Sequence, residues 1–140
     1  MAEDVGDIEV SSVLLIQGDA RRLPIESESV DLVLTSPPYG NLRDYNGYNF
    51  EFESIANEIF RVIKFGGVIV WVVGDETDQT GESGESFRQA LYFKSIGLRL
   101  HDTMIYMKSG PAYPSQNRYY QVFEYMFIFS KGMPCAIWYA

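Results

Sequence analysis

The chain has 140 residues, of which 46% are hydrophobic, and this length predicts one hydrophobic core in a single domain spanning residues 1–140. Nineteen acidic and 11 basic residues give a formal net charge of −8, which argues against a protein that binds nucleic acid unaided through a basic stripe. The apolar runs are too short to cross a membrane, and the first ten residues lack the features of a secretory signal. The lone cysteine, Cys135, excludes an intrachain disulfide and fits a cytoplasmic location.

The first half of the chain predicts two strands and a helix. The apolar run SVLLIQ (Ser12–Gln17) predicts a buried strand that ends at Gly18-Asp19, and VDLVLT (Val30–Thr35) predicts another that ends at two prolines. Apolar residues recur at helical spacing in EFESIANEIFRVIK (Glu51–Lys64), which predicts a helix. We expect Gly66-Gly67 to cap its C-terminus.

The second half predicts a strand, a helix and a final pair of strands. The continuous apolar run Val68–Val73 is typical of a strand covered on both faces. Residues Glu85–Ser95 predict a helix closed by Gly97, and the residues expected to face inward are Phe87, Ala90 and Leu91. No helical pattern separates the strands around Leu100–Lys108 and Phe123–Lys131, so we expect an antiparallel pair at one edge of the sheet.

These elements together predict an α/β fold, in which strands alternate with helices. In open sheets of this kind ligands bind beyond the carboxyl ends of the strands. Asp19, Ser36 and Asp75 each follow a predicted strand, so we expect them at that end. The single histidine, His101, predicts no metal site.

The segment TSPPYG (Thr35–Gly40) has an unusual chemistry for the end of a strand. Proline has no N–H group, so Pro37 and Pro38 leave a loop rich in carbonyl acceptors, to which Ser36 adds a hydroxyl. A group with two donors, such as an aromatic amine, fits these acceptors, and Tyr39 offers a flat face for stacking on its ring. Acceptors that hold both N–H bonds favour a pyramidal nitrogen with an available lone pair. A rigid turn with Tyr39 as a packing residue is the alternative interpretation.

The motif and its surroundings resemble the site-specific DNA amino-methyltransferases, which modify cytosine N4 or adenine N6. TSPPYG followed by NLRDY resembles their motif IV, and QGDARRLPIESESVDLVLTSPPY resembles the segment that leads into it. EIFRVIKFGGVIVWVVGD and the closing segment LRLHDTMIYMKSGPAYPSQNRYYQVFEYMFIFSKG are also similar to the family. The resemblance implies a Rossmann-like methyltransferase sheet and S-adenosylmethionine as methyl donor.

The resemblance also implies roles for individual residues. Ser36, Pro37, Pro38 and Tyr39 would form the catalytic loop, with Tyr39 stacking on a base flipped out of double-stranded DNA. Serine at the first motif position favours cytosine N4 over adenine N6.

Other residues are given cofactor or substrate roles. Asp19 would accept a hydrogen bond from the adenine amino group of the cofactor, with Thr35 nearby, although an acidic cap on the following turn is an alternative for Asp19. Arg43, Lys108 and Arg118 are candidate contacts to the substrate; the alternative is a surface ion pair for Arg43 and a solvated charge for Lys108 and Arg118.

The Phe-x-Gly-x-Gly loop that binds the cofactor in this family is not found in the sequence. In the permuted members the loop follows motif IV and a target-recognition region, so the chain is interpreted as C-terminally incomplete, with a partial sheet that lacks the glycine-loop strands. Three hypotheses follow. The chain is a fragment or split subunit of a DNA methyltransferase that needs a second chain carrying the glycine loop; or a small RNA or other amine methyltransferase completed by homodimerisation; or a non-enzymatic dimeric remnant or binding module.

Overall fold

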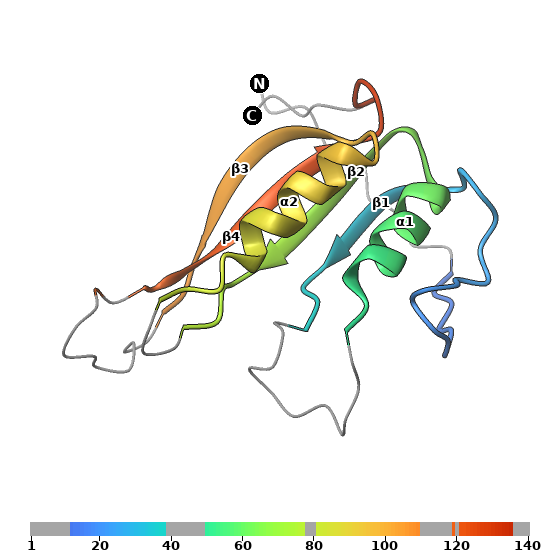
Figure 1. The fold of residues 1–140 in the computed structure, drawn as a ribbon. Helices are drawn as coiled ribbons and strands as arrows, with labels where there is room; N and C mark the ends of the chain where they lie inside the picture. Colours follow the sequence, from blue (N-terminus) through green and yellow to red (C-terminus); the bar gives the residue numbers. More distant parts are fainter. Residues whose placement is uncertain (1–11, 39–49, 78–80, 110–118, 120, 136–140) are drawn as a thin grey trace, which may run out of the picture.

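The fold is an α/β arrangement of one mixed sheet and two helices (Figure 1). A computed structural model describes residues 12–38, 50–77, 81–109, 119 and 121–135. Its elements are β1 (Val30–Thr35), α1 (Phe52–Val62), β2 (Ile63–Val73), α2 (Glu85–Ser95), β3 (Arg99–Met107) and β4 (Phe123–Ser130). The strand order is β1-β2-β4-β3. Strands β1 and β2 are parallel, whereas β4 is antiparallel to both β2 and β3, which confirms the predicted antiparallel pair at one edge.

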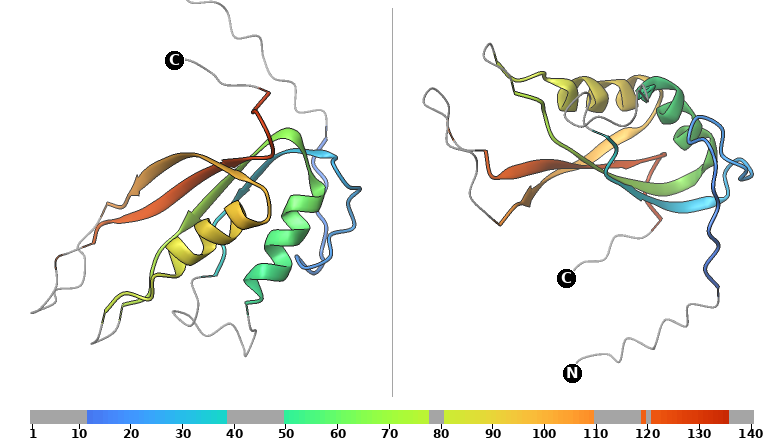
Figure 2. Two further views of the ribbon diagram at one scale, coloured as in Figure 1. Left: turned by 45° about the horizontal axis from the view of Figure 1, so that its top comes forward. Right: turned by 90° about the horizontal axis from the view of Figure 1, so that it is seen from below.

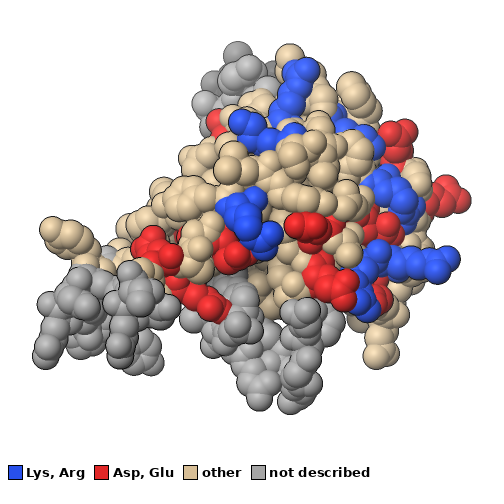
Figure 3. All heavy atoms as spheres, in the orientation of Figure 1, with Lys and Arg blue, Asp and Glu red and all other residues tan. Residues whose placement is uncertain are grey.

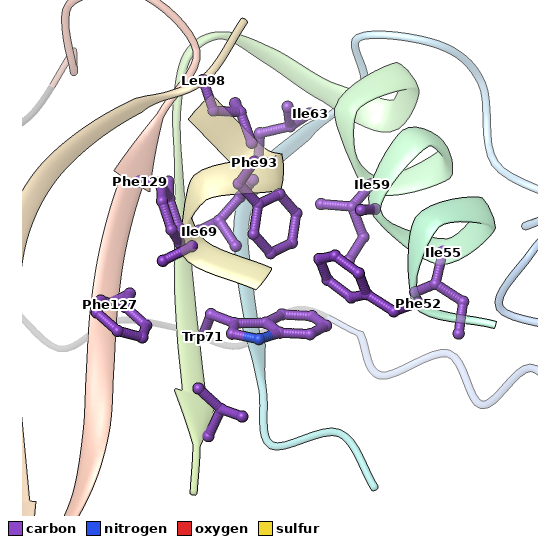
Figure 4. Close-up of a cluster of buried hydrophobic side chains, with 13 residues drawn as sticks. Phe52, Ile55, Ile59, Ile63, Ile69, Trp71, Phe93, Leu98, Phe127 and Phe129 are labelled. Carbon is purple, nitrogen blue, oxygen red and sulfur yellow. The ribbon is translucent and has the colours of Figure 1, made fainter. Parts of the chain in front are cut away.

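Both helices lie on the same face of the sheet (Figure 2). The core forms between them and the sheet, where aromatic side chains pack edge to face or tilted at short range. The centroid of the Phe93 ring lies 5.0 Å from that of the Trp71 ring and 4.9 Å from that of the Phe129 ring (Figure 4). The described part of the chain contains no helix long and apolar enough to span a membrane.

Helix α1 is amphipathic as predicted, and its buried residues are Phe52, Ile55, Ala56, Ile59 and Val62. The expected cap at Gly66-Gly67 is wrong, because the helix ends at Val62 and the chain enters β2 directly at Ile63. The end of the helix is instead held by Lys131, whose Nζ donates to the carbonyl oxygens of Phe60 at 3.0 Å and Ile63 at 3.3 Å.

Gly66 and Gly67 lie in a bulge of β2. Between two register positions β1 advances from Val30 to Leu32, while β2 advances from Ile63 to Val68. Gly66 has a φ of +84°, and a Cβ there would lie 2.1 Å from the Cys135 Sγ, so the glycine is required by the close passage of the C-terminal segment.

Helix α2 has the predicted span, but its predicted inward face is wrong at two of three positions. Ala90 is buried, whereas Phe87 and Leu91 are 49% and 65% exposed. The buried face centres on Ser86, Gln89 and Phe93. Two hydrogen bonds to buried polar residues of α2 hold the helix in this orientation. The Trp71 indole donates to the Gln89 Oε1 at 2.9 Å, and the Ser86 backbone N–H donates to the Asp75 Oδ1 at 3.0 Å. Polar partners of this kind do not register in a hydrophobic pattern.

The predicted strand at Ser12–Gln17 is wrong, because this segment has no regular structure and its apolar side chains are exposed, Leu15 by 92%. The expectation of burial is also wrong for half of β1, where Leu32 and Leu34 are exposed while Val33 packs against the core. Within the described residues Ser12–Gln17 has no neighbouring strand to pair with, whereas Leu32 and Leu34 lie on the face of the sheet that carries neither helix. A strand needs a neighbouring strand to satisfy its backbone hydrogen bonds.

Candidate functional site at the carboxyl end of β1

The Ser-Pro-Pro segment lies immediately beyond the carboxyl end of β1. Thr35 is the last residue of the strand and pairs in register with Trp71 of β2. Ser36 is exposed, Pro37 is buried and Pro38 is half-buried, so the first proline anchors the turn while the serine residue stays accessible at the surface. Tyr39 lies outside the described residues. The exposed Ser36 is thus held on a rigid base, as a hydrogen-bonding site requires.

Asp75 follows β2 at the same end of the sheet, and its carboxylate is engaged by the start of α2. Its Oδ1 accepts hydrogen bonds from the Ser83 hydroxyl at 2.9 Å and from the Ser86 backbone N–H at 3.0 Å, and its Oδ2 bonds to the Ser86 hydroxyl. These contacts satisfy donors at the N-terminus of a helix. Asp75 therefore positions α2, and the exposed Ser36 lies beyond the neighbouring strand β1 at the same end of the sheet.

Asp19 does not follow a strand, but a side-chain network connects it to the start of α1. Arg21 donates to the Asp19 Oδ2 at 2.6 Å and to the Glu51 Oε1 at 2.5 Å. Because α1 begins at the end of the sheet where β1 terminates, Asp19 lies toward the same end as Ser36 (Figure 1).

The Asp19 carboxylate is already fully engaged. Its Oδ1 accepts from the Arg21 backbone N–H at 2.9 Å and from Nε at 3.0 Å, and its Oδ2 accepts from Nε at 3.0 Å and Nη2 at 2.6 Å. The side-chain hydrogen bonds from Arg21 lower the pKa of Asp19 from 3.8 to about 2. This geometry is the acidic turn cap that the sequence offered as an alternative. The cofactor role of Asp19 stays a prediction.

A second network fixes the segment that precedes β1 against α1. The Arg61 guanidinium donates to the backbone carbonyl of Ile25 at 2.9 Å and to the Glu58 Oε1 at 2.6 Å, and Glu58 accepts the Leu23 N–H at 2.7 Å. The hydrogen bond from Arg61 lowers the pKa of Glu58. The path from Asp19 into β1 is therefore tied to the helix at several points.

Lys108 is an exposed residue that forms an ion pair with Glu124, and its role as a substrate contact stays a prediction. The Glu124 side chain is 10% exposed and that of Lys108 is 50% exposed. Glu124 stands one residue inside the amino end of β4, which lies at the same end of the sheet as the carboxyl ends of β1 and β2. Arg43 and Arg118 lie outside the described residues.

Sequence reasoning missed the Arg21–Glu51 link and the Lys108–Glu124 pair. The Asp-x-Arg spacing at Asp19 was a usable local signal for its own ion pair, whereas both longer-range pairs depend on the fold. Acidic and basic side chains are intermixed over the face that carries α1 and α2 (Figure 3). The described residues of this face therefore present no basic stripe of the kind expected for binding along a nucleic-acid backbone.

Comparison with known proteins identifies the family. The family model described as DNA methylase, which covers the N6 and N4 types, matches residues 30–135. The chain belongs to the DNA methylase family. The matched residues begin with β1 and include the Ser-Pro-Pro segment, so the candidate site falls within the part of the chain that the family shares.

Two curated methyltransferases extend the comparison. The chain is 63% identical over 109 residues to the orphan methyltransferase M.BamHII of Bacillus amyloliquefaciens, a match that covers 78% of this chain and 41% of the relative. It is 30% identical to the type II beta methyltransferase M.BslI of a Bacillus species, over 88% of this chain and 17% of the relative. The chain thus spans less than half the length of either relative.

Solved structures of DNA methylases share the fold. A putative DNA modification methylase of Thermus thermophilus, in complex with S-adenosyl-L-methionine, is 26% identical with a TM-score of 0.66, and the match covers 88% of this chain and 56% of that one. The cytosine-N4-specific PvuII DNA methyltransferase is 21% identical with a TM-score of 0.64, covering 84% of this chain and 48% of that one. These similarities confirm the expected Rossmann-like methyltransferase architecture.

Proposed function

We propose that this chain supplies the amine-binding part of a DNA methyltransferase catalytic domain, which transfers a methyl group from S-adenosylmethionine to the exocyclic amine of a flipped base. The observation that carries the proposal is the exposed Ser36 on the buried Pro37 at the carboxyl end of β1, within the matched family region. A cytoplasmic location and double-stranded DNA as substrate belong to the same proposal.

In this proposal the loop acts by accepting hydrogen bonds. The Ser36 Oγ and the Pro37 carbonyl accept the two N–H bonds of the amine and favour a nitrogen whose lone pair is available for attack. Pro38 restricts the backbone, so the two acceptors are oriented before the base arrives. Tyr39 stacks on the ring of the flipped base. The serine at position 36 makes cytosine N4 the favoured amine.

The described residues do not by themselves fit the cofactor. Both oxygens of the Asp19 carboxylate are engaged by Arg21, so an adenine amino group would have to displace those hydrogen bonds. The chain also spans 41% of M.BamHII and 56% of the Thermus methylase, both of which extend beyond the matched region. We therefore propose that a complementing polypeptide completes the cofactor site.

The test is methyl transfer from radiolabelled S-adenosylmethionine to cytosine-containing duplex DNA, with the part of M.BamHII outside its match supplied in trans. Ser36→Ala is expected to lower the rate by about 10²-fold or more, as for removal of one preorganised polar group from a catalytic site. Ser95→Ala is the control, since that hydroxyl only donates to the Tyr92 carbonyl on α2. Mass spectrometry of the nucleosides distinguishes N4-methylcytosine from N6-methyladenine. Equal rates for Ser36→Ala and the unsubstituted chain would contradict the proposed role of the loop.

A further inference from the structure

The ion pair of Lys108 and Glu124 lies at the end of the sheet that carries Ser36. Glu124 is buried at the amino end of β4, and Lys108 directly follows β3. Because Tyr125 pairs with the last residue of β2, the preceding Glu124 lies opposite Gly74, which directly follows β2. The carboxylate is therefore placed at the carboxyl end of β2, the strand next to the one that leads into Ser36.

The absence of a side chain at Gly74 leaves space beside the Glu124 carboxylate. A Cβ built at Gly74 would lie 3.5 Å from the Glu124 Cγ and 3.8 Å from its Oε1. The same Oε1 contacts the Lys108 Nζ. The ammonium is thus held one contact away from an atom beside Gly74, although Lys108 belongs to the end of β3, two strands from β2. A buried carboxylate fixes this position, because a charge-assisted hydrogen bond is strong and its loss leaves a buried charge unpaired.

Alternation along the strands places Ser36 and Glu124 on the same side of the sheet. The Tyr125 ring contacts that of Phe87 on α2, with 5.2 Å between the centroids, so Tyr125 faces the helices and the adjacent Glu124 faces away from them. Leu34 of β1 also faces away from the helices and is 68% exposed. Ser36 follows Leu34 by two residues, so continuation of the alternation brings Ser36 to the side of Glu124.

The spacing between Ser36 and the held ammonium suits the edge of one base. Thr35 pairs with Trp71, so Ser36 stands one residue beyond this pair. Gly74 stands three residues beyond the pair on the neighbouring strand, a shift of two residues relative to Ser36. With strands about 4.8 Å apart and a rise of about 3.3 Å per residue, the two positions are separated by roughly 8 Å. Two hydrogen bonds of about 2.9 Å each, on either side of a base edge, fill a distance of this size.

We propose that Lys108 donates a hydrogen bond to the ring nitrogen next to the amino group of the flipped base, and that Glu124 positions the ammonium for this contact. The inference rests on the proposed function, in which Ser36 and the Pro37 carbonyl accept the two N–H bonds of the amino group. Beside that group cytosine presents the acceptor N3 and adenine the acceptor N1, and an ammonium with three donors can bond to Glu124 and to this acceptor at once. Thymine presents a carbonyl oxygen and an N–H at the same places, so both halves of the site are left unpaired.

Titration of the 140-residue chain with 2′-deoxycytidine, followed by nuclear magnetic resonance, tests this inference without the cofactor. The comparison ligand is 3-deaza-2′-deoxycytidine, in which a C–H group replaces N3 and the amino group is kept. We expect the deaza nucleoside to bind about tenfold more weakly, because it lacks the acceptor for a charged donor. In Lys108→Met the two nucleosides should bind equally. Glu124→Gln should reduce the difference in part, since the amide has the size of the carboxyl group but no charge to hold the ammonium.

Lys94→Met is the matched control, because Lys94 is an exposed lysine on α2, and it should leave the difference between the nucleosides unchanged. Backbone amide resonances of β3 and β4 verify that each variant keeps the strand pair.

Three outcomes overturn the inference. One is equal affinity of the unsubstituted chain for the two nucleosides, and another is binding of neither up to the limit of their solubility. The third is a loss of affinity in Lys108→Met for 2′-deoxycytidine 5′-phosphate but not for 2′-deoxycytidine, which would make Lys108 a phosphate contact. Failure of the proposed function has a different signature, namely a preference over the deaza nucleoside that depends on Lys108 while Ser36→Ala changes neither nucleoside binding nor methylation.

Discussion

On one face of the sheet, Trp71 and Phe129 lie buried beneath two helices, whereas on the other face Leu34 is largely exposed. Along β2 both faces are equally apolar in sequence, since Val68–Val73 alternates between them without a polar residue. The difference lies in what covers them within the described residues. The side chains on the helix-covered face are packed in a hydrophobic core. Those on the opposite face are apolar in β2 but remain partly exposed, which overturns the prediction that the Val68–Val73 run is covered on both faces. Apolar composition alone is therefore not sufficient to bury a sheet face, because burial also requires a layer that covers the face.

The largest expected difference between the faces comes from deleting a side chain on each. Phe93→Ala removes a fully buried ring that packs on Phe52, Trp71 and Phe129, and should lower the free energy of unfolding by about 3–5 kcal/mol. Leu34→Ala should change it by less than about 0.5 kcal/mol in the isolated chain, because most of that side chain is already in water. Urea denaturation followed by tryptophan fluorescence measures both. Comparable losses would mean that the opposite face is buried in solution.

A smaller effect is expected at the margin of the helix-covered face, where Lys131 holds the end of α1. Its side chain is 13% exposed, donates to two carbonyl oxygens and to Glu28, and its Nζ lies 4.5 Å from the centroid of the Phe60 ring. Lys131→Met should cost about 1–3 kcal/mol, because the carbonyls at the helix end lose a charged donor.

Lys94→Met is the matched control for this change, since Lys94 is an exposed lysine in the last turn of α2. It should shift the denaturation midpoint far less. Equal shifts for the two variants would show that Lys131 does not stabilise the end of α1 more than an exposed lysine does.

The smallest effect concerns Asp19, on the segment that runs past the edge of both faces. Hydrogen bonds from Arg21 lower its pKa to about 2, so the Asp19–Arg21 link is intact above the ordinary carboxyl value of 3.8 and is lost as the pH falls through about 2. Carbon-13 NMR titration of the carboxyl group should report this low value, and Arg21→Gln should raise it toward the ordinary one. An unshifted titration in the unsubstituted chain would show that the link does not persist in solution.

Local pattern was enough to predict several parts of the fold. The span of α2, the buried stripe of α1 and the antiparallel pair β3–β4 follow from apolar periodicity and from the absence of a helical segment between the last two strands. The Ser-Pro-Pro motif and its place at the end of β1 were also predictable, because the motif directly follows an unambiguous apolar strand.

The errors arose where distant residues decide the outcome. The face of α2 is set by Trp71 and Asp75, which lie before the helix in sequence and select Gln89 and Ser86. The end of α1 is held by Lys131, which lies 69 positions beyond Val62 in the sequence. Gly66 does not cap this helix and instead lies in the bulge of β2. Ser12–Gln17 has the composition of a strand, but strand formation requires a neighbouring strand as well as suitable residues.

The passage of the C-terminal segment across the bulge of β2 has a practical consequence. Cys135 is exposed, and its N–H donates to the Gly66 carbonyl at 3.0 Å, near the amino ends of β1 and β2. Six residues of β1 separate that end of the sheet from Ser36, a span of roughly 20 Å at the usual rise per residue. As the one cysteine of the sequence, Cys135 accepts a single thiol-reactive fluorophore without any prior substitution. Energy transfer from such a label to a dye on duplex DNA would report the approach of a base to the Ser36 end while leaving that end chemically untouched.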